Sequence, residues 1–144
     1  MIEHLAKNYP AAERYARDAI DMLANNPSLL PFALALRARS LHGQGRIVEA
    51  LAFAQDAHAQ LEMLGQVQDG EPTIRLAFAE CLVASSDLTT AKKVIEKATW
   101  RLRKQASSIA VPEWRKSFLN RIPEHVCILA LSRALGLSGP EGEN

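Results

Sequence analysis

The sequence has few of the residue patterns on which catalytic and metal sites depend. Its 144 residues include two cysteines and four histidines, and none of them has the paired spacing of a zinc site. The seven glycines do not match a phosphate-binding loop, and no serine lies in the Gly-x-Ser-x-Gly pattern of a hydrolase. We therefore expect no metal, no cofactor and no enzymatic activity in this chain.

Long apolar runs are also missing. No stretch approaches the roughly 18 apolar residues typical of a membrane-spanning helix, and the opening residues MIEH lack the basic and then apolar order of a secretory signal. Cys81 and Cys127 lie far apart in apolar segments, so we expect both to be buried small hydrophobic residues and not a disulfide. These features predict a soluble, cytoplasmic protein without membrane contact.

Aromatic residues make up only 6% of the chain, whereas hydrophobic residues together make up 48%. This balance favours helices packed through alanine and leucine over a β-sandwich, which needs more valine, tyrosine and threonine. Strand patterns are absent from the sequence. The positions of proline, glycine and asparagine predict an all-α fold of about seven helices, over residues 10–24, 28–42, 47–64, 71–84, 88–109, 112–122 and 123–135.

Alanines recur in three sets, each spaced like one face of a helix. The sets are Ala12, Ala16 and Ala19; Ala50, Ala54 and Ala57; and Ala91, Ile95 and Ala98. Steps of four and three residues place each set on one helical stripe. The sets follow one another after 38 and 41 residues, which is the range of stacked helical hairpins. The sequence therefore predicts a repeat scaffold in which small residues let paired helices approach closely.

These sets resemble the small-residue positions of tetratricopeptide repeats. The pattern also falls on Ala38 and Leu41 in the second unit and on Ala79 and Leu82 in the third. The helices are longer than those of the standard repeat of about 34 residues, and the usual Trp, Tyr and closing Pro are missing. The resemblance implies a right-handed α-solenoid of antiparallel hairpins over residues 1–110, with an incomplete first repeat, which binds a protein or peptide partner.

In tetratricopeptide arrays, the first helix of each unit lines an inner groove that receives a partner segment. By this resemblance, the lining includes Phe32, Arg39, His42, Thr73, Leu76 and Glu80. Core packing explains Phe32 and Leu76 equally well, whereas Arg39 and Glu80 are harder to bury. The lysine and asparagine set that clamps a C-terminal carboxylate in such proteins is not present, which disfavours binding of a chaperone tail.

A second resemblance concerns the last third of the chain. Residues 114–119 (WRKSFL) and 122–124 (IPE) resemble the closing segment of repeat arrays in large bacterial regulators that carry a Ser/Thr kinase or ATPase module. His125 stands where that pattern often has asparagine. The resemblance implies the C-terminal part of a longer signalling protein. We expect the helices over 111–137 to cap the array, with Trp114, Phe118 and Leu119 covering the preceding helix, and residues 138–144 to be disordered.

Basic residues are concentrated near the C-terminal end. Residues 88–121 contain nine lysines and arginines and two acidic residues. Lys93, Lys97, Arg101 and Lys104 fall on one stripe of the predicted helix, so they form either a solvated face or a docking face for an acidic partner or nucleic acid. Trp100 lies near this stripe. We expect the helix over 112–122 to cover it, and the alternative is an exposed interface anchor.

The sequence thus favours a non-catalytic protein-interaction scaffold. Two alternatives stay open: the runner-up is a nucleic-acid-associated regulatory domain that uses the basic helix 88–109, and the third possibility is a purely structural spacer or self-association segment. Nucleic acid is nevertheless not the partner that we expect. A homodimer is also left open, because the helix over 10–24 lacks a full hairpin partner. We expect an exposed apolar patch on this helix, covered by residues 1–8 or by a second copy.

Overall fold

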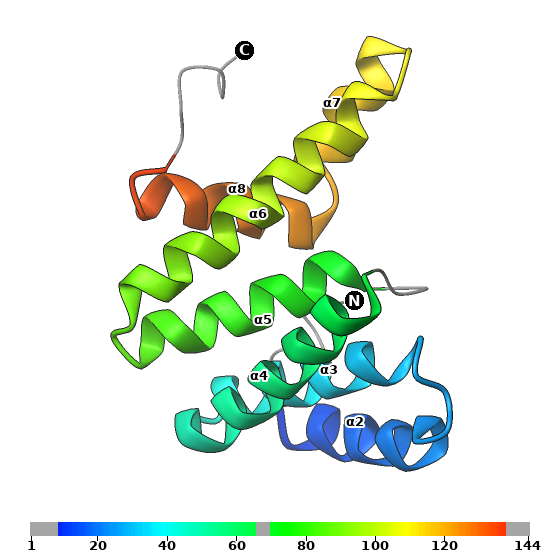
Figure 1. Cartoon of the computed structure of the whole chain (residues 1–144), viewed down its shortest axis with the longest axis vertical. Helices are drawn as coiled ribbons and strands as arrows, with labels where there is room; N and C mark the ends of the chain where they lie inside the picture. Colours follow the sequence, from blue (N-terminus) through cyan, green and yellow to red (C-terminus); the bar gives the residue numbers. More distant parts are fainter. Residues whose placement is uncertain (1–8, 66–69, 138–144) are drawn as a thin grey trace.

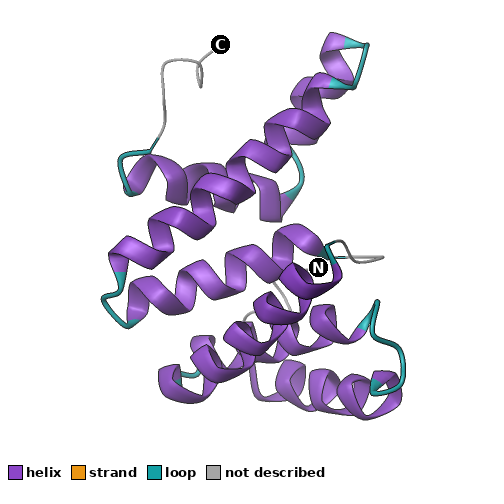
Figure 2. Cartoon of the chain, viewed as in Figure 1, coloured by secondary structure: helices purple, strands orange, loops and turns teal. Residues whose placement is uncertain are grey.

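The computed structural model describes residues 9–65 and 70–137. Within them it contains seven α-helices and no strand (Figure 1, Figure 2), which confirms the all-α prediction. The helices are α2 (Tyr9–Leu23), α3 (Leu30–Gly43), α4 (Ile47–Leu64), α5 (Glu71–Ala84), α6 (Leu88–Ser107), α7 (Pro112–Asn120) and α8 (Pro123–Ala134). Residues 1–8 and the predicted tail at 138–144 lie outside the described residues, as does most of the predicted loop at 66–70.

Helix starts follow the proline and capping patterns of the sequence. Proline occupies the first or second position of α3, α5, α7 and α8, where an N–H group would have no helical partner. The Asp87 carboxylate caps α6 by accepting a hydrogen bond of 3.2 Å from the Thr90 N–H. α3 begins later than expected because the N–H groups of Leu29 and Leu30 both bond Asn26 O, which holds this segment in a turn.

The alanine stripes lie inside the hairpins, as the sequence predicts. Ala38 of α3 and Ala50 of α4 are fully buried, and so are Ala79 of α5 and Ala91 of α6. These alanines belong to one continuous core, to which Leu41, Leu61, Ile74, Ile95 and Leu102 contribute the larger side chains. Small residues at these positions let α3 pack closely on α4, and α5 on α6.

The same turn ends α3, α5 and α8. A residue with positive φ stands just after each helix: Gly45 (80°), Ser86 (66°) and Gly136 (76°). The next N–H group closes each turn onto a carbonyl five residues back, as in a Schellman motif. These hydrogen bonds are Arg46 N–H to Leu41 O, Asp87 N–H to Leu82 O and Leu137 N–H to Ser132 O. The three turns therefore mark equivalent points of a repeating unit.

α8 packs in the C-terminal half as α5 packs in the middle. α5 contacts both helices of the hairpin before it, α3 and α4, and α8 likewise contacts both α5 and α6. Because α5 and α8 share this packing order, and α3 ends in the same closing turn, we call α3, α5 and α8 the inner helices. α2, α4 and α6 are the outer helices (Figure 1). No helix of the described residues is long and apolar enough to cross a membrane.

α7 is a short helix inserted between α6 and α8. It contacts both neighbours, and Phe118 stacks on His125 of α8 with 4.5 Å between ring centroids. None of its residues is buried, however, and Trp114 is 67% exposed. The prediction that Trp114 covers α6 is wrong, because the first turn of α7 lies at the tip where α6 and α7 project beyond α8 (Figure 1).

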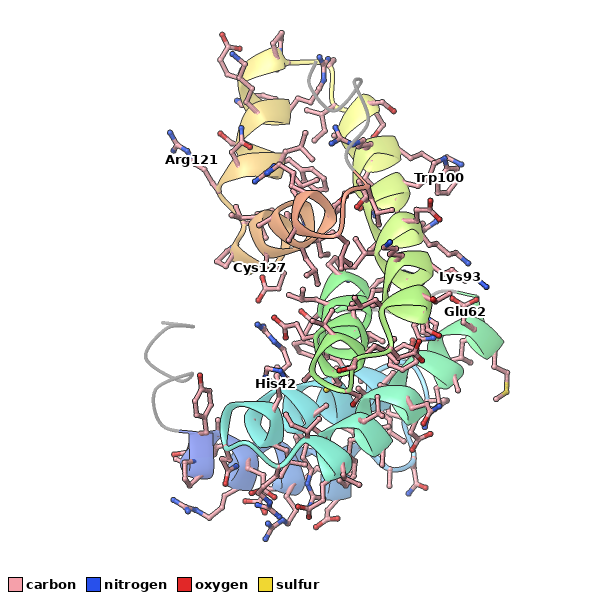
Figure 3. The ribbon with its side chains drawn as sticks, turned by 90° about the vertical axis from the view of Figure 1, so that its left-hand side faces the viewer. His42, Glu62, Lys93, Trp100, Arg121 and Cys127 are labelled. Atoms are coloured by element: carbon pink, nitrogen blue, oxygen red, sulfur yellow. The ribbon has the colours of Figure 1, made fainter. Side chains whose placement is uncertain are left out.

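Two other burial predictions are also wrong. Trp100 is 56% exposed, because it points to the side of α6 away from Arg121 and the chain between α7 and α8 (Figure 3). The Lys104 ammonium lies over its ring, 4.8 Å from the centroid. Cys127 is exposed, since it lies at the surface near Arg39 and Glu80, whereas Cys81 is buried as expected. Both thiols are free.

Candidate functional site

An ion pair joins the first two inner helices at equivalent positions. Arg39 of α3 and Glu80 of α5 stand 41 residues apart, and two hydrogen bonds join them: Nε to Oε1 at 3.2 Å and Nη2 to Oε2 at 3.4 Å. Both side chains stay about one quarter exposed, 28% and 26%. The sequence places both residues on the inner groove, and the structure brings them together as a two-bond pair at the surface.

The other predicted groove residues divide into two groups. His42 of α3 is half-buried and lies on the same side of the molecule as Cys127 (Figure 3). Phe32 is also half-buried and packs so closely on Gly70 that a Cβ atom there would overlap its ring. Thr73 and Leu76 are buried. They therefore contribute to the core of α5 and cannot reach a partner on this surface.

Cys127 of α8 lies beside the Arg39–Glu80 pair. Burial raises the pKa of its thiol, while the nearby Arg39 charge lowers it and Glu80 raises it by smaller effects. Leu36, one turn before Arg39 on α3, is 38% exposed. We define the inner surface as Leu36, Arg39, His42, Glu80 and Cys127. Sequence reasoning missed Cys127 because the insertion of α7 shifts α8 out of the 41-residue spacing.

Two of the four residues in the predicted basic stripe on α6 pair with acidic residues of other helices. Lys97 Nζ lies 3.4 Å from Glu62 of α4, and Arg101 makes two hydrogen bonds of 2.8 Å to Glu71 of α5. Lys104 covers Trp100, and Lys93 is exposed without an ion pair among the described residues. Figure 3 shows Lys93, Glu62 and Trp100 on the side opposite to His42 and Cys127. Two of the four predicted cations therefore hold helices together.

Glu71 is the centre of this second group. It accepts hydrogen bonds from Arg101 and from the buried Arg75, which also contacts Glu62 at 3.2 Å. Burial by itself raises the pKa of Glu71, but the hydrogen bonds from Arg101 and Arg75 outweigh it and leave the pKa below its usual value. Burial, followed by the Arg75 charge, lowers the pKa of His58, whose ring packs on Phe78. The group therefore holds α4, α5 and α6 together.

A third group fixes α2 to the first hairpin. Glu13 of α2 is almost fully buried and pairs with Arg17 at 3.0 Å, Arg46 at 3.2 Å and Arg37 at 3.4 Å. Burial raises the pKa of Glu13, but the hydrogen bonds from Arg17 and Gln44 and the charge of Arg46 outweigh this effect, so its pKa is lowered. A carboxylate enclosed by three guanidinium groups has a structural role.

Within the described residues, no three histidine, cysteine or acidic side chains are grouped as metal ligands would be. No protein-family model matches the chain, and no curated protein and no solved structure matches it. The resemblance to tetratricopeptide repeats therefore stays a prediction. Function has to be argued from the surfaces themselves.

Proposed function

We propose that the chain is a non-catalytic protein-interaction scaffold, and that a segment of a partner protein binds the inner surface of α3, α5 and α8. The observation that carries this proposal is the Arg39–Glu80 pair, which is about one quarter exposed and bridges two inner helices. Two exposed side chains lie beside it, the apolar Leu36 and the small Cys127. A polar pair beside an exposed apolar side chain can fix the register of a bound peptide, while the peptide's apolar side chains supply affinity.

The proposed partner segment carries an apolar anchor next to a polar or charged group. The anchor packs against Leu36, and the polar group bonds the outward-facing atoms of the Arg39–Glu80 pair. Because the inner helices are held by a buried core and two ionic ties, the surface is pre-formed, and little conformational entropy is lost from the scaffold on binding.

Nucleic-acid binding through α6 is the weaker candidate. Lys97 and Arg101 already neutralise Glu62 and Glu71, so fewer cations are available to phosphates than the sequence indicates. Membership of a longer bacterial regulator with a kinase or ATPase module is a further part of the proposal. It rests only on the resemblance of residues 114–119 and 122–124, and the reading frame upstream of this sequence tests it.

Selection of peptides from a random library on the folded chain tests the binding proposal. We expect ligands whose affinity falls at least about tenfold, or 1.4 kcal/mol, in Leu36→Glu and in Arg39→Glu. Val48→Glu is the matched control, because Val48 is exposed on α4 and lies outside the inner surface. Ligands that respond to Val48→Glu but not to Leu36→Glu would place the binding surface elsewhere and contradict the proposal.

A further inference from the structure

The outward side of α2 exposes a residue that the complete hairpins cover. Tyr15 stands 38 residues before Phe53 of α4, which in turn stands 41 residues before Val94 of α6, the spacings of the alanine sets. Phe53 is half-buried under Arg37 of its own inner helix, with 4.3 Å from the guanidinium carbon to the ring centroid, and Val94 is buried. Tyr15 is 70% exposed. Within the described residues, α2 is therefore an outer helix without its inner partner.

At the other end of the array, α8 exposes a residue at a position that is buried in the other inner helices. Val126 stands ten residues before Gly136, as Ala35 stands before Gly45 and Leu76 before Ser86. Ala35 and Leu76 are fully buried, whereas Val126 is 39% exposed. Within the described residues, no outer helix follows α8 to cover this position. α8 is therefore an inner helix without its outer partner.

The two ends carry opposite charges. Asp18 and Asp21 are exposed on α2, and Arg121 and Arg133 are exposed at the two ends of α8. None of the four makes an ion pair with another described residue. Arg14 of α2 and Glu124 of α8 also make no ion pair with a described residue. The α2 end therefore keeps an excess of one negative charge, and the α8 end an excess of one positive charge. Charge complementarity thus favours contact between unlike ends.

We propose that the chain associates head to tail, with α2 of one copy packing on α8 of the next and completing the hairpin that each lacks within the described residues. The register follows from the α3–α4 hairpin. Arg37, which contacts Phe53, stands eight residues before Gly45, and Ile128 stands eight residues before Gly136. Tyr15 takes the place of Phe53 and packs on the exposed Val126 of the next copy, since Ile128 itself is fully buried. Since paired helices run antiparallel, Asp21 then lies beside Arg121 of the next copy.

This contact joins two different surfaces, so it does not close after two copies and has the potential to continue. It uses the outward side of α2, which the inner surface does not include, and the exposed side of α8, where Val126 lies next to Cys127 of the inner surface. The tests below change Asp21 and Arg121, which lie outside the inner surface. Sedimentation equilibrium of the full 144-residue chain across a wide concentration range tests the head-to-tail association. The weight-average mass should rise with concentration beyond twice the chain mass of 15.8 kDa.

Charge exchange tests the register. Asp21→Lys alone and Arg121→Glu alone should each stay monomeric where the parent chain associates, because each places like charges together at the contact. An equimolar mixture of the two variants should associate again, since each variant then meets the opposite charge on the other. Circular dichroism of each variant checks that it is folded. Val48→Lys, which changes an exposed residue away from both ends, should associate like the parent.

Three outcomes would overturn the proposal. A parent chain that stays at 15.8 kDa at every concentration means that nothing from a second copy covers the ends, and residues 1–8 are then the remaining candidate for the α2 side. A mass that levels off at twice this value indicates a symmetric dimer through a single surface. Two charge variants that associate as well as the parent, or that fail to associate when mixed, contradict the contact between Asp21 and Arg121.

Discussion

At the scale of single residues, Ser86 is the residue that fits its backbone least well. Its φ of 66° lies in the left-handed region, and the equivalent positions of the other two turns are occupied by glycine, Gly45 and Gly136. A residue with a Cβ atom costs roughly 1–2 kcal/mol in that conformation, and glycine does not. The gain on introducing glycine is reduced by about 0.4–1 kcal/mol, because glycine makes the unfolded chain more flexible.

We therefore expect Ser86→Gly to stabilise the fold by about 0.5–1 kcal/mol, the difference between these two effects. Urea denaturation followed by circular dichroism measures the change. Gly45→Ser is the matched reverse variant and should destabilise by a similar amount. A Cβ atom at Gly45 would meet no other atom within 4 Å, so conformation alone sets its cost. Equal stabilities of all three proteins would mean that the turn tolerates serine without strain.

The two thiols should differ in reactivity. Cys81 is fully buried, and burial raises its pKa to about 12, whereas Cys127 is exposed on α8. Because the thiolate is the reacting species, Ellman's reagent should titrate one thiol in the native chain at pH 8 and two in urea. The Cys127→Ser variant should show none in the native state. A native titre of two would contradict the burial of Cys81.

At the scale of helices, the close contact inside each hairpin is the feature most sensitive to side-chain volume. Ala50 and Ala91 have no exposed surface, so replacing either with leucine should overpack the contact and cost roughly 1–3 kcal/mol. Ala52→Leu is the control, because Ala52 is exposed on the same helix as Ala50. Thermal unfolding should separate Ala50→Leu from the parent and leave Ala52→Leu close to it.

The helices could be predicted well from the sequence because their start and stop patterns are local. Prolines, Asp87 and the alanine spacing depend only on neighbours within a few residues. The position of α8 could not be predicted from the sequence. Its equivalence to α5 is shown only by the turn at Gly136 and by its contacts with two earlier helices. The predictions that Trp100 and Trp114 are buried were wrong for a similar reason, because their burial depends on the angle between α6 and α7 and not on neighbouring residues alone.

The candidate site was predicted only in part. Charge identified Arg39 and Glu80 as surface residues, because ionised side chains are costly to bury alone. Their pairing depends on α3 and α5 lying side by side, which the repeat spacing indicates. The basic stripe was misjudged because Lys97 and Arg101 meet acids from α4 and α5, and a pattern along one helix says nothing about its neighbours.

At the scale of the whole molecule, carboxylates with lowered pKa values should govern acid stability. Burial alone would raise the pKa of Glu13, Glu62 and Glu71, but hydrogen bonds and charges from basic side chains outweigh it at all three. Such groups stabilise the fold above their unfolded pKa of about 4.3, and the contribution is lost as the pH falls through the folded pKa.

The melting temperature should therefore hold between about pH 7 and pH 5.5 and fall below about pH 4.5, as the carboxylates become protonated first in the unfolded chain. Differential scanning calorimetry over this range checks it. The Glu71→Gln variant should melt at a lower temperature than the parent at pH 7. Its melting temperature should fall less on acidification, because it has no carboxylate to protonate at that position. A parent curve that stays flat to pH 3 would show that these ion pairs do not stabilise the fold.

The Arg39–Glu80 pair also limits how this array can lengthen. Arg39 and Glu80 occupy equivalent positions on adjacent inner helices, six residues before the residue of positive φ, and they carry opposite charges. The equivalent residue of α8 is the neutral Ala130. The closing turn of α8 comes nine residues later than the repeat spacing predicts. Duplicating one unit in place would set arginine against arginine or glutamate against glutamate. Duplicating two consecutive units would keep the alternation. Length in this architecture should therefore change by even numbers of repeats, a parity rule set by one ion pair.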